Sequence, residues 1–366
     1  MKIAFFISDE GYGHSMRQKN IIGELLEHCA HVSITVFTKD KISLFQDTFD
    51  NRINYVNIFN YILLSKDSCG TLEPINTWHS FQNWYNNLDY WLNCVMASFD
   101  PDTHLIVSDS VPQVTLLYDQ FKVKTIFIQH FTWDWFYSTL YGDDTIYHAM
   151  HKFYSHPSGS FLFPPLTPKL NLDLHPSYQD LDFIVNKQLI LSTSQTMHIA
   201  NSDSKLRLLL MNNGTNSITS IINNVLLHLP ILDNWQLVLR NDTLSNDLRS
   251  IALSRSDVLL IDGLNSMHLE LSNASLVLAR PGYNIISETY SLRKHVVFLD
   301  EPSNPEINSN LDLIRNISHF HISPRQECLS VLHSLLINSF KSSSTFTTAL
   351  GSSQAMLHIV QSILYG

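Results

Sequence analysis

The stretch SLVLARPGYNIISETYSLRKHVVFLD, residues Ser275–Asp300, decides the fold. Its first apolar run is typical of a buried strand and ends at Arg280-Pro281-Gly282, where Tyr283 and Asn284 open a segment with helical spacing. A second apolar run, His295–Leu299, follows that helix. Short apolar strands joined by helices are typical of parallel sheets covered on both faces. The stretch therefore predicts a strand–helix–strand unit of an α/β domain.

The same alternation runs through both halves of the chain. Further strands are expected at Lys2–Ser8, Val32–Thr38, Ile53–Ile58, His104–Asp109, Lys124–His130, Lys205–Gly214, Asn234–Asn241 and Asp257–Gly263. A proline-rich stretch without regular period begins at His156 and separates the two sets. The chain of 366 residues is also longer than one hydrophobic core comfortably serves. We therefore expect two Rossmann-like, doubly wound parallel-sheet domains facing each other across a cleft.

The domain boundaries follow from these changes of character. Residues 1–165 are expected to form the N-terminal domain, and residues 166–186 an interdomain linker. Residues 187–345 are expected to form the C-terminal domain. The tail, 346–366, predicts a helix from about Ser352 to Leu364 that could pack back on the N-terminal domain.

Composition excludes several classes of function. The net charge is −10 without a basic run, so a nucleic-acid partner is not expected. The four cysteines (Cys29, Cys69, Cys94 and Cys328) lack metal-binding or disulfide spacing, which fits a reducing cytoplasm. The N-terminal apolar run is too short to span a membrane, so membrane contact would be peripheral.

The loop after the first strand reads Gly11-Tyr12-Gly13-His14. Glycines let a backbone approach a ligand, and a histidine beside a helix N-terminus can act as a general base near neutral pH. The same residues also fit a tight turn with a partly buried histidine. Arg17 either faces the ligand or packs within the first helix.

Two further polar groups follow strands of the first half. Asp109 ends the fourth strand, where it either supports His14 or caps the next helix. Trp133, Asp134 and Tyr137 follow the fifth strand, and aromatic faces beside a carboxylate suit a polyhydroxylated ligand as well as they suit core packing.

The second half offers places for a diphosphate and a ribose. The turn Asn213-Gly214-Thr215 and the helix start at Gly282-Tyr283-Asn284 are both suited to phosphate binding through backbone N–H groups. Glu288 on the same helix could accept two ribose hydroxyls, and the loop Glu301–Asn310 supplies more polar groups.

Together these segments resemble the GT-B glycosyltransferases. GYGH, the glycine turn of the second half and NASLVLARPGYNIISETYSLRKHVVFL resemble the family of the peptidoglycan N-acetylglucosaminyltransferase. VSDSVP and FTWDWFY add a likeness to the glycosyltransferase-like half of L-arabinokinases, although the kinase half has no counterpart here.

The resemblance implies a nucleotide-diphosphate-sugar donor, of the UDP class, bound by the C-terminal donor domain, 187–345. It implies a glycan, lipid-linked or small-molecule acceptor bound by the N-terminal acceptor domain, 1–165. It places His14 at the reacting centre and assigns the sugar or acceptor to Tyr12, Arg17, Trp133, Asp134 and Tyr137. It assigns the donor to Gly11, Gly13, Asn213, Gly214, Thr215, Arg280, Gly282, Tyr283, Asn284, Ser287, Glu288, Glu301, Asn304 and Glu306. It implies no cofactor and no metal at the leaving phosphates.

The leading hypothesis is an inverting glycosyltransferase in which His14, assisted by Asp109, deprotonates the acceptor hydroxyl. GYGHSMR also resembles the UDP-sugar hydrolases of pseudaminic acid synthesis, in which water replaces the acceptor. A noncatalytic protein that binds sugar nucleotides on the same fold is the third hypothesis.

Overall fold

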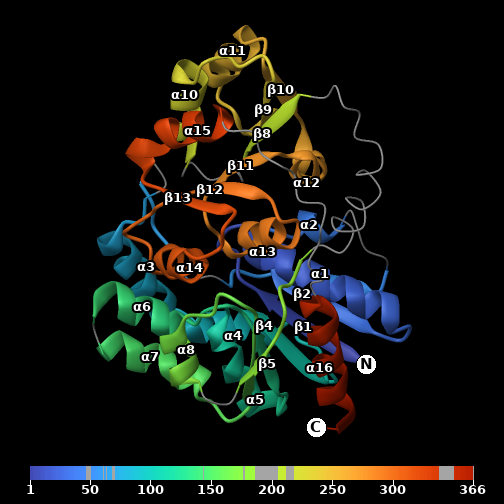
Figure 1. Ribbon diagram of the computed structural model, residues 1–366. Coiled ribbons are helices and arrows are strands. Elements are labelled where there is room, and N and C mark those ends of the chain that lie inside the picture. The colour runs from blue at the N-terminus through green and yellow to red at the C-terminus, as the bar shows by residue number, and fades with distance from the viewer. Residues whose placement is uncertain are drawn as a thin grey trace. The chain divides into compact units, whose positions relative to one another are not determined.

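The structure is a computed structural model, and it describes residues 1–46, 51–60, 62, 64–67, 71–142, 144–175, 178–185, 205–211, 218–337 and 350–365. The chain divides into two compact units (Figure 1). Unit 1 comprises Met1–Ser65, Leu72–Val185 and Ala349–Gly366, and unit 2 comprises Lys66–Thr71 and Asn186–Thr348.

Unit 1 contains a parallel sheet of seven strands in the order β3-β2-β1-β4-β5-β6-β7. Its strands are β1 (Lys2–Ile7), β2 (Ser33–Thr38), β3 (Ile53–Asn57), β4 (Leu105–Asp109), β5 (Thr125–Ile128), β6 (Gly159–Phe163) and β7 (Tyr178–Asp180). Its helices are α1 (Gly13–His28), α2 (Ser43–Gln46), α3 (Pro74–Asn86), α4 (Leu88–Met96), η1 (Pro112–Thr115), α5 (Leu116–Phe121), α6 (Trp133–Tyr141), α7 (Asp144–Tyr154), α8 (Lys169–Leu174) and α16 (Gly351–Tyr365).

Both faces of this sheet are covered, and β1 shows how the sequence achieves it. Alternate residues of a strand point to opposite faces. Ile3, Phe5 and Ile7 pack in one core cluster with apolar residues of α1 and α16. Ala4 and Phe6 pack in the other cluster, with residues of α3, α4, α6 and α7. A continuous apolar run is therefore needed, because neither face of β1 meets solvent.

Unit 2 contains a parallel sheet of six strands in the order β10-β9-β8-β11-β12-β13. Its strands are β8 (Leu206–Leu210), β9 (Trp235–Arg240), β10 (Val258–Ile261), β11 (Leu276–Ala279), β12 (His295–Leu299) and β13 (Phe320–Ser323). Its helices are α10 (Thr219–His228), η4 (Asn241–Thr243), α11 (Asn246–Ser254), α12 (Gly263–Asn273), α13 (Tyr283–Ser291), α14 (Pro305–Ile314), η5 (Arg325–Glu327) and α15 (Cys328–Ile337).

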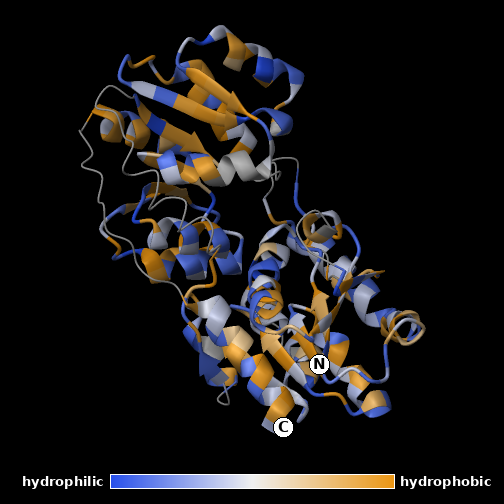
Figure 2. Cartoon of the chain, turned by 90° about the vertical axis from the view of Figure 1, so that its right-hand side faces the viewer, coloured by the Kyte–Doolittle hydropathy of each residue, from blue (hydrophilic) through white to orange (hydrophobic). Residues whose placement is uncertain are grey.

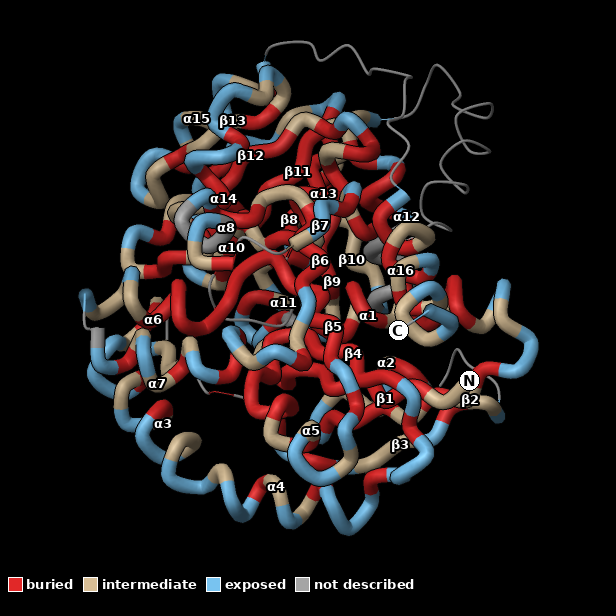
Figure 3. Tube along the Cα trace, turned by 90° about the horizontal axis from the view of Figure 1, so that it is seen from below, coloured by how far each residue is buried: buried red, intermediate tan, exposed pale blue. Residues whose placement is uncertain are grey.

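The predicted fold class, two parallel α/β sheets with helices between the strands, is confirmed. Figure 2 shows the strands as largely hydrophobic, and Figure 3 shows β1, β4 and β5 as buried while α3 and α4 alternate between buried and exposed residues. Within the described residues, no helix is long and apolar enough to cross a membrane.

Three segments differ from the sequence-based expectations. Residues 166–186, expected as a linker, contain α8 and β7, and β7 adds to the unit 1 sheet beside β6. Residues 305–310, expected as part of the polar loop Glu301–Asn310, belong to α14, which Asn304 caps by accepting from the N–H of Ile307. The short strand β13 was not expected at all.

The C-terminal helix α16 belongs to unit 1. It packs on α1 with Ala355, Met356 and Ile359 in the shared core, and Ser353 Oγ donates to Glu24 Oε2 at 2.9 Å. Its first residue, Gly351, lies against the backbone of the segment that follows β7. A Cβ added there would lie 2.8 Å from the carbonyl carbon of Phe183, and closer still to the Asp182 oxygen.

We predict that Gly351→Ala destabilises the protein by about 1–3 kcal/mol, because a rigid backbone leaves no room for the methyl group. Gly23→Ala is the matched control, since a Cβ on this α1 residue would meet nothing within 4 Å. The control is expected to gain up to about 1 kcal/mol from helix propensity. Urea unfolding measures both variants, and equal stabilities would contradict the packing of α16 described here.

Candidate active site

The centre of the unit 1 sheet is a topological switch point. Strands β1 and β4 lie side by side; the chain builds outward through β2 and β3 on one side, and through β5, β6 and β7 on the other. In sheets of this kind ligands bind beyond the carboxyl ends of the strands at the switch point. His14 and Asp109, predicted from the sequence as a catalytic pair, follow or end these two strands.

The loop after β1 is fixed by its own polar contacts. Asp9 Oδ1 accepts from Thr38 Oγ1 at 2.6 Å and from the backbone N–H groups of Lys39 and Asp40, which tie this loop to the end of β2. Gly11 has a φ of 72°, a left-handed conformation that favours glycine. Helix α1 then begins at Gly13, so His14 lies in its first turn.

The Asp109 carboxylate is the centre of a buried polar cluster. Its Oδ2 accepts from Arg17 Nε and Gln18 Nε2, both at 2.8 Å. Its Oδ1 accepts from Arg17 Nη2 at 2.7 Å and contacts His14 Nδ1 at 2.8 Å. Arg17 and Asp109 are 1% and 0% exposed, so this is a bidentate ion pair inside the protein.

The Asp109 contact selects the tautomer of His14. A carboxylate can only accept, so this 2.8 Å contact assigns a proton to Nδ1 and leaves the lone pair of the neutral ring on Nε2. Arg17 Nη2 lies farther from Nδ1, at 3.2 Å, and donates to Asp109 Oδ1 instead. In the described part of the chain Nε2 has no hydrogen-bond partner, and the side chain keeps 10% of its surface exposed. The pair therefore has the geometry of a general base whose imidazole is oriented by a carboxylate.

Electrostatics keep Asp109 ionised. Burial by itself would raise the pKa of the Asp109 carboxyl, but the charges and hydrogen bonds of Arg17 and His14 outweigh it. The pKa of Asp109 consequently lies well below its ordinary value. An ionised Asp109 can stabilise the positive charge that His14 gains when it takes a proton.

The backbone after Asp109 is strained. Ser110 has a φ of 59°, a left-handed conformation that is uncommon for residues other than glycine. Its N–H donates to Gln129 Oε1 at 2.8 Å, and its carbonyl accepts from Trp133 Nε1 at 2.9 Å. Strained residues that the surroundings hold in place concentrate at functional sites. Trp133 thus contributes to the site through the backbone beside Asp109.

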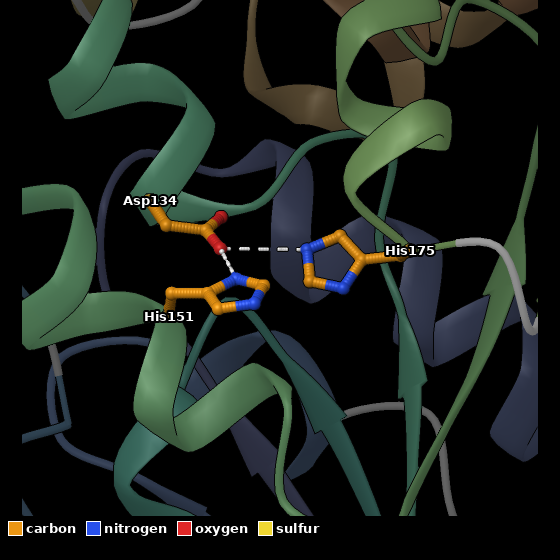
Figure 4. Close-up of side chains that lie close together, drawn as sticks. All are labelled: Asp134, His151 and His175. Carbon is orange, nitrogen blue, oxygen red and sulfur yellow. Dashed lines mark hydrogen bonds and ion pairs between the residues drawn. The ribbon is translucent and has the colours of Figure 1, made fainter. Parts of the chain in front are cut away.

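The residues predicted to contact a sugar differ from one another in exposure. Tyr12 is 40% exposed, and Lys41 Nζ lies 4.5 Å from the centre of its ring. Trp133, Asp134 and Tyr137 are each 0% exposed, so contact with a ligand would need this segment to move. Asp134 instead contacts His151 and His175 (Figure 4). Burial raises the pKa of Asp134, but these histidine contacts outweigh it and lower that pKa to about 2.

In unit 2 the helix start predicted to bind a diphosphate lies at the end of β11. Gly282 is the N-cap of α13, and no side chain caps this helix. Arg280 Nε donates to Glu301 Oε2 at 2.6 Å, and the Arg280 side chain is 23% exposed. Helix α13 and Arg280 thus bring a positive helix end and a cation to one edge of the sheet.

Three of the other predicted donor residues, Ser287, Glu301 and Asn304, make contacts within the fold. Ser287 Oγ donates to the Asn284 carbonyl at 2.8 Å. Glu301 accepts from Arg280 and Asn304, and Asn304 caps α14. Glu288 is buried in the second turn of α13, and Glu306 is half-buried. Asn213, Gly214 and Thr215 lie outside the described residues.

Sequence reasoning missed one member of the Asp109 cluster, Gln18, which donates to the carboxylate. Arg17 also extends the cluster to His130, with its Nη1 3.2 Å from His130 Nδ1. Residues three and four apart share one face of a helix, so the spacing from His14 to Arg17 and Gln18 was the available signal.

Solved structures with this fold include sugar transferases. Arabidopsis thaliana UGT89C1 complexed with UDP-L-rhamnose matches over 99% of this chain and 98% of that chain, with a TM-score of 0.64 and 11% identity. A UDP-glucosyltransferase from Polygonum tinctorium capable of glucosylating indoxyl matches over 100% of this chain and 99% of that chain, with a TM-score of 0.60 and 10% identity. MurG of Acinetobacter baumannii matches over 98% of this chain and 99% of that chain, with a TM-score of 0.59 and 11% identity.

At these identities the likeness shows the fold alone, and it confirms the predicted GT-B fold. No protein-family model matches the sequence, and no curated protein sequence matches it.

We predict that Asp109→Asn costs about 3 kcal/mol of stability at pH 7, because it leaves the buried Arg17 guanidinium without its counter-charge. Asp109 has a lower pKa in the folded chain than in the unfolded chain. Its contribution is therefore complete at neutral pH and declines as the pH falls below about 4, the ordinary pKa of the group.

Urea unfolding at pH 7, 5 and 3.5 measures this contribution. The wild type is expected to lose more stability between pH 5 and pH 3.5 than the Asp109→Asn variant, which no longer carries the titrating group. Parallel pH profiles would contradict the assignment.

Proposed function

We propose that the protein is a glycosyltransferase that moves a sugar from a nucleotide-diphosphate-sugar, of the UDP class, to an acceptor hydroxyl. The observation that carries the proposal is the His14–Asp109 pair at the switch point of the unit 1 sheet. The fold adds support, because UGT89C1, which shares it, has been solved in complexes with UDP-L-rhamnose, UDP and quercetin.

His14 acts as the general base in this proposal. Its Nε2 takes the proton of the acceptor hydroxyl while Nδ1–H donates to Asp109. The acceptor oxygen bonds to the anomeric carbon, and the bond from that carbon to the diphosphate oxygen breaks. Direct attack of this kind inverts the configuration at the anomeric carbon. Because Asp109 remains ionised, it balances the imidazolium charge that forms.

Unit 2 binds the donor in this proposal. The N-terminus of α13 and the Arg280 guanidinium stabilise the departing diphosphate, and Glu301 holds Arg280 in place. Glu288 accepts the ribose hydroxyls, and Glu306 lies near the donor sugar. No metal is required at the leaving phosphates, so transfer is expected to proceed equally with and without added Mg²⁺ or Mn²⁺.

Free thiols at Cys29, Cys94 and Cys328 fit a reducing, cytoplasmic location.

We predict that His14→Gln lowers the turnover number about 10²- to 10⁴-fold, the usual contribution of a general base. Glutamine retains a donor for Asp109, so the fold of the cluster and the affinity for UDP are expected to stay unchanged. The measurement is UDP release from a UDP-sugar in the presence of an acceptor panel.

His28→Gln is the matched control, because His28 lies on the same helix with 47% of its side chain exposed. Full transfer activity in the His14→Gln variant would remove His14 from the mechanism.

The donor assignment has its own test. A thermal-shift screen with UDP-, GDP-, CMP- and dTDP-sugars identifies the nucleotide, since a bound ligand raises the melting temperature. Glu288→Gln is expected to weaken binding of the selected nucleotide roughly tenfold or more, the effect of losing hydrogen bonds to a charged acceptor. Glu327→Gln, a change at an exposed carboxylate of unit 2, is the control.

The same assays separate the alternatives. Equal sugar release with and without acceptors would make the protein a nucleotide-sugar hydrolase. Donor binding without turnover across the panel would make it a noncatalytic binding protein.

A further inference from the structure

A second cluster of titratable side chains lies in unit 1, apart from the Asp109 cluster. It consists of Asp134 in the first turn of α6, His151 in the last turn of α7, and His175 directly after α8. Figure 4 shows the three side chains pointing toward one another. One donor atom from each lies within 4.8 Å of the others.

The Asp134 carboxylate divides its two oxygens between different partners. Oδ1 accepts from the backbone N–H of Trp135 at 2.8 Å. Oδ2 faces both imidazoles, at 2.8 Å from His151 Nδ1 and 3.4 Å from His175 Nε2. One carboxylate oxygen and two ring nitrogens therefore converge on one point.

His175 supplies an independent observation. Its side chain is 4% exposed, and its Nε2 makes no hydrogen bond of good geometry in the part of the chain that the structure describes. A buried polar atom without a well-formed hydrogen bond is destabilising. The ring is nonetheless held with Nε2 aimed at the cluster, because it packs against Phe161 at 4.6 Å and Tyr154 at 5.8 Å between ring centres.

The charge of this cluster also favours a bound cation. Asp134 is 0% exposed, and among the described residues no lysine or arginine pairs with it. The Asp109 carboxylate, equally buried, has Arg17 as its counter-ion. A cation among the three side chains would balance the Asp134 charge and give His175 Nε2 a partner.

The donor set suits a transition metal. Two imidazoles and one carboxylate are ligands that Zn²⁺ accepts, with bonds of about 2.0–2.2 Å. Such bonds place neighbouring donors of a tetrahedral site about 3.3 Å apart. The distance of 3.4 Å from Asp134 Oδ2 to His175 Nε2 already matches this spacing. The distance of 2.8 Å from Asp134 Oδ2 to His151 Nδ1 has to increase when the metal binds. The His151 side chain is 25% exposed, which leaves a route for the ion and for a water as fourth ligand.

We propose that Asp134, His151 and His175 form a binding site for a divalent transition metal of the zinc type, which ties α6, α7 and the end of α8 together. The site is independent of the proposed transfer reaction. Its ligands are Asp134 Oδ2, His151 Nδ1 and His175 Nε2, with water completing the coordination.

Metal titration of the full-length chain tests the proposal. After treatment with a chelator and desalting, one equivalent of Zn²⁺ is expected to raise the melting temperature by roughly 5 °C once the site is saturated. Co²⁺ at the same site is expected to give the visible absorption of a tetrahedral ion, which reports on the ligands without any activity assay.

Single substitutions identify the ligands. His175→Gln and His151→Gln are each expected to abolish the cobalt absorption and the zinc-dependent rise in melting temperature. His148→Gln is the matched control, because His148 is an exposed residue of the same helix as His151 and should leave both signals intact.

Two results would overturn the proposal. One is a wild-type protein whose melting temperature and cobalt spectrum do not respond to metal; the cluster would then be a hydrogen-bonded network with a protonated histidine. The other is metal binding that survives in His175→Gln and His151→Gln, which would place the ion on surface histidines. Each glutamine variant is tested by itself, so if one does not fold, by circular dichroism, the other decides.

Discussion

The buried ion pair between Arg17 and Asp109 is the interaction on which the candidate site depends. Taking a carboxylate and a guanidinium out of water is costly unless their geometry is good and their remaining atoms are hydrogen-bonded. Here the contact is bidentate, and Gln18 and His14 occupy the rest of the carboxylate. This ion pair holds the first turns of α1 against the end of β4, and it thereby sets the orientation of His14.

Much of the fold was predictable because a parallel sheet imposes a simple pattern on the sequence. Strands buried on both faces need apolar runs, and β1 and β11 have them, while β4 begins with one before it ends in Ser108 and Asp109. The switch-point rule then brought His14 and Asp109 together without any contact being known. The short strands β7 (YQD) and β13 (FHIS) were missed because neither contains the continuous apolar run that identified the other strands.

The roles of individual polar residues were harder to predict, because a polar side chain after a strand can serve a ligand or the fold. Glu301 and Asn304 follow β12 as donor contacts would, yet Glu301 holds Arg280 and Asn304 caps α14. Trp133 suited a sugar equally well, yet its indole supports the strained backbone at Ser110. Only three-dimensional contacts separate these uses. The contact between His175 and Asp134 joins two segments that are far apart in the sequence, and the spacing of these residues does not predict it.

Unit 1 thus contains two histidine–aspartate pairs in which the counter-charge decides the chemistry. Asp109 is neutralised by Arg17, so the cluster carries no net charge while His14 is neutral, and His14 can take up a proton and release it again. Among the described residues, Asp134 has histidines as its possible counter-charges, so a neutral cluster there requires a proton held on an imidazole or a bound cation. A held proton would leave His175 Nε2 in poor geometry, whereas a cation uses all three donors at once. The same pair of residue types therefore suits proton transfer in one place and metal binding in the other.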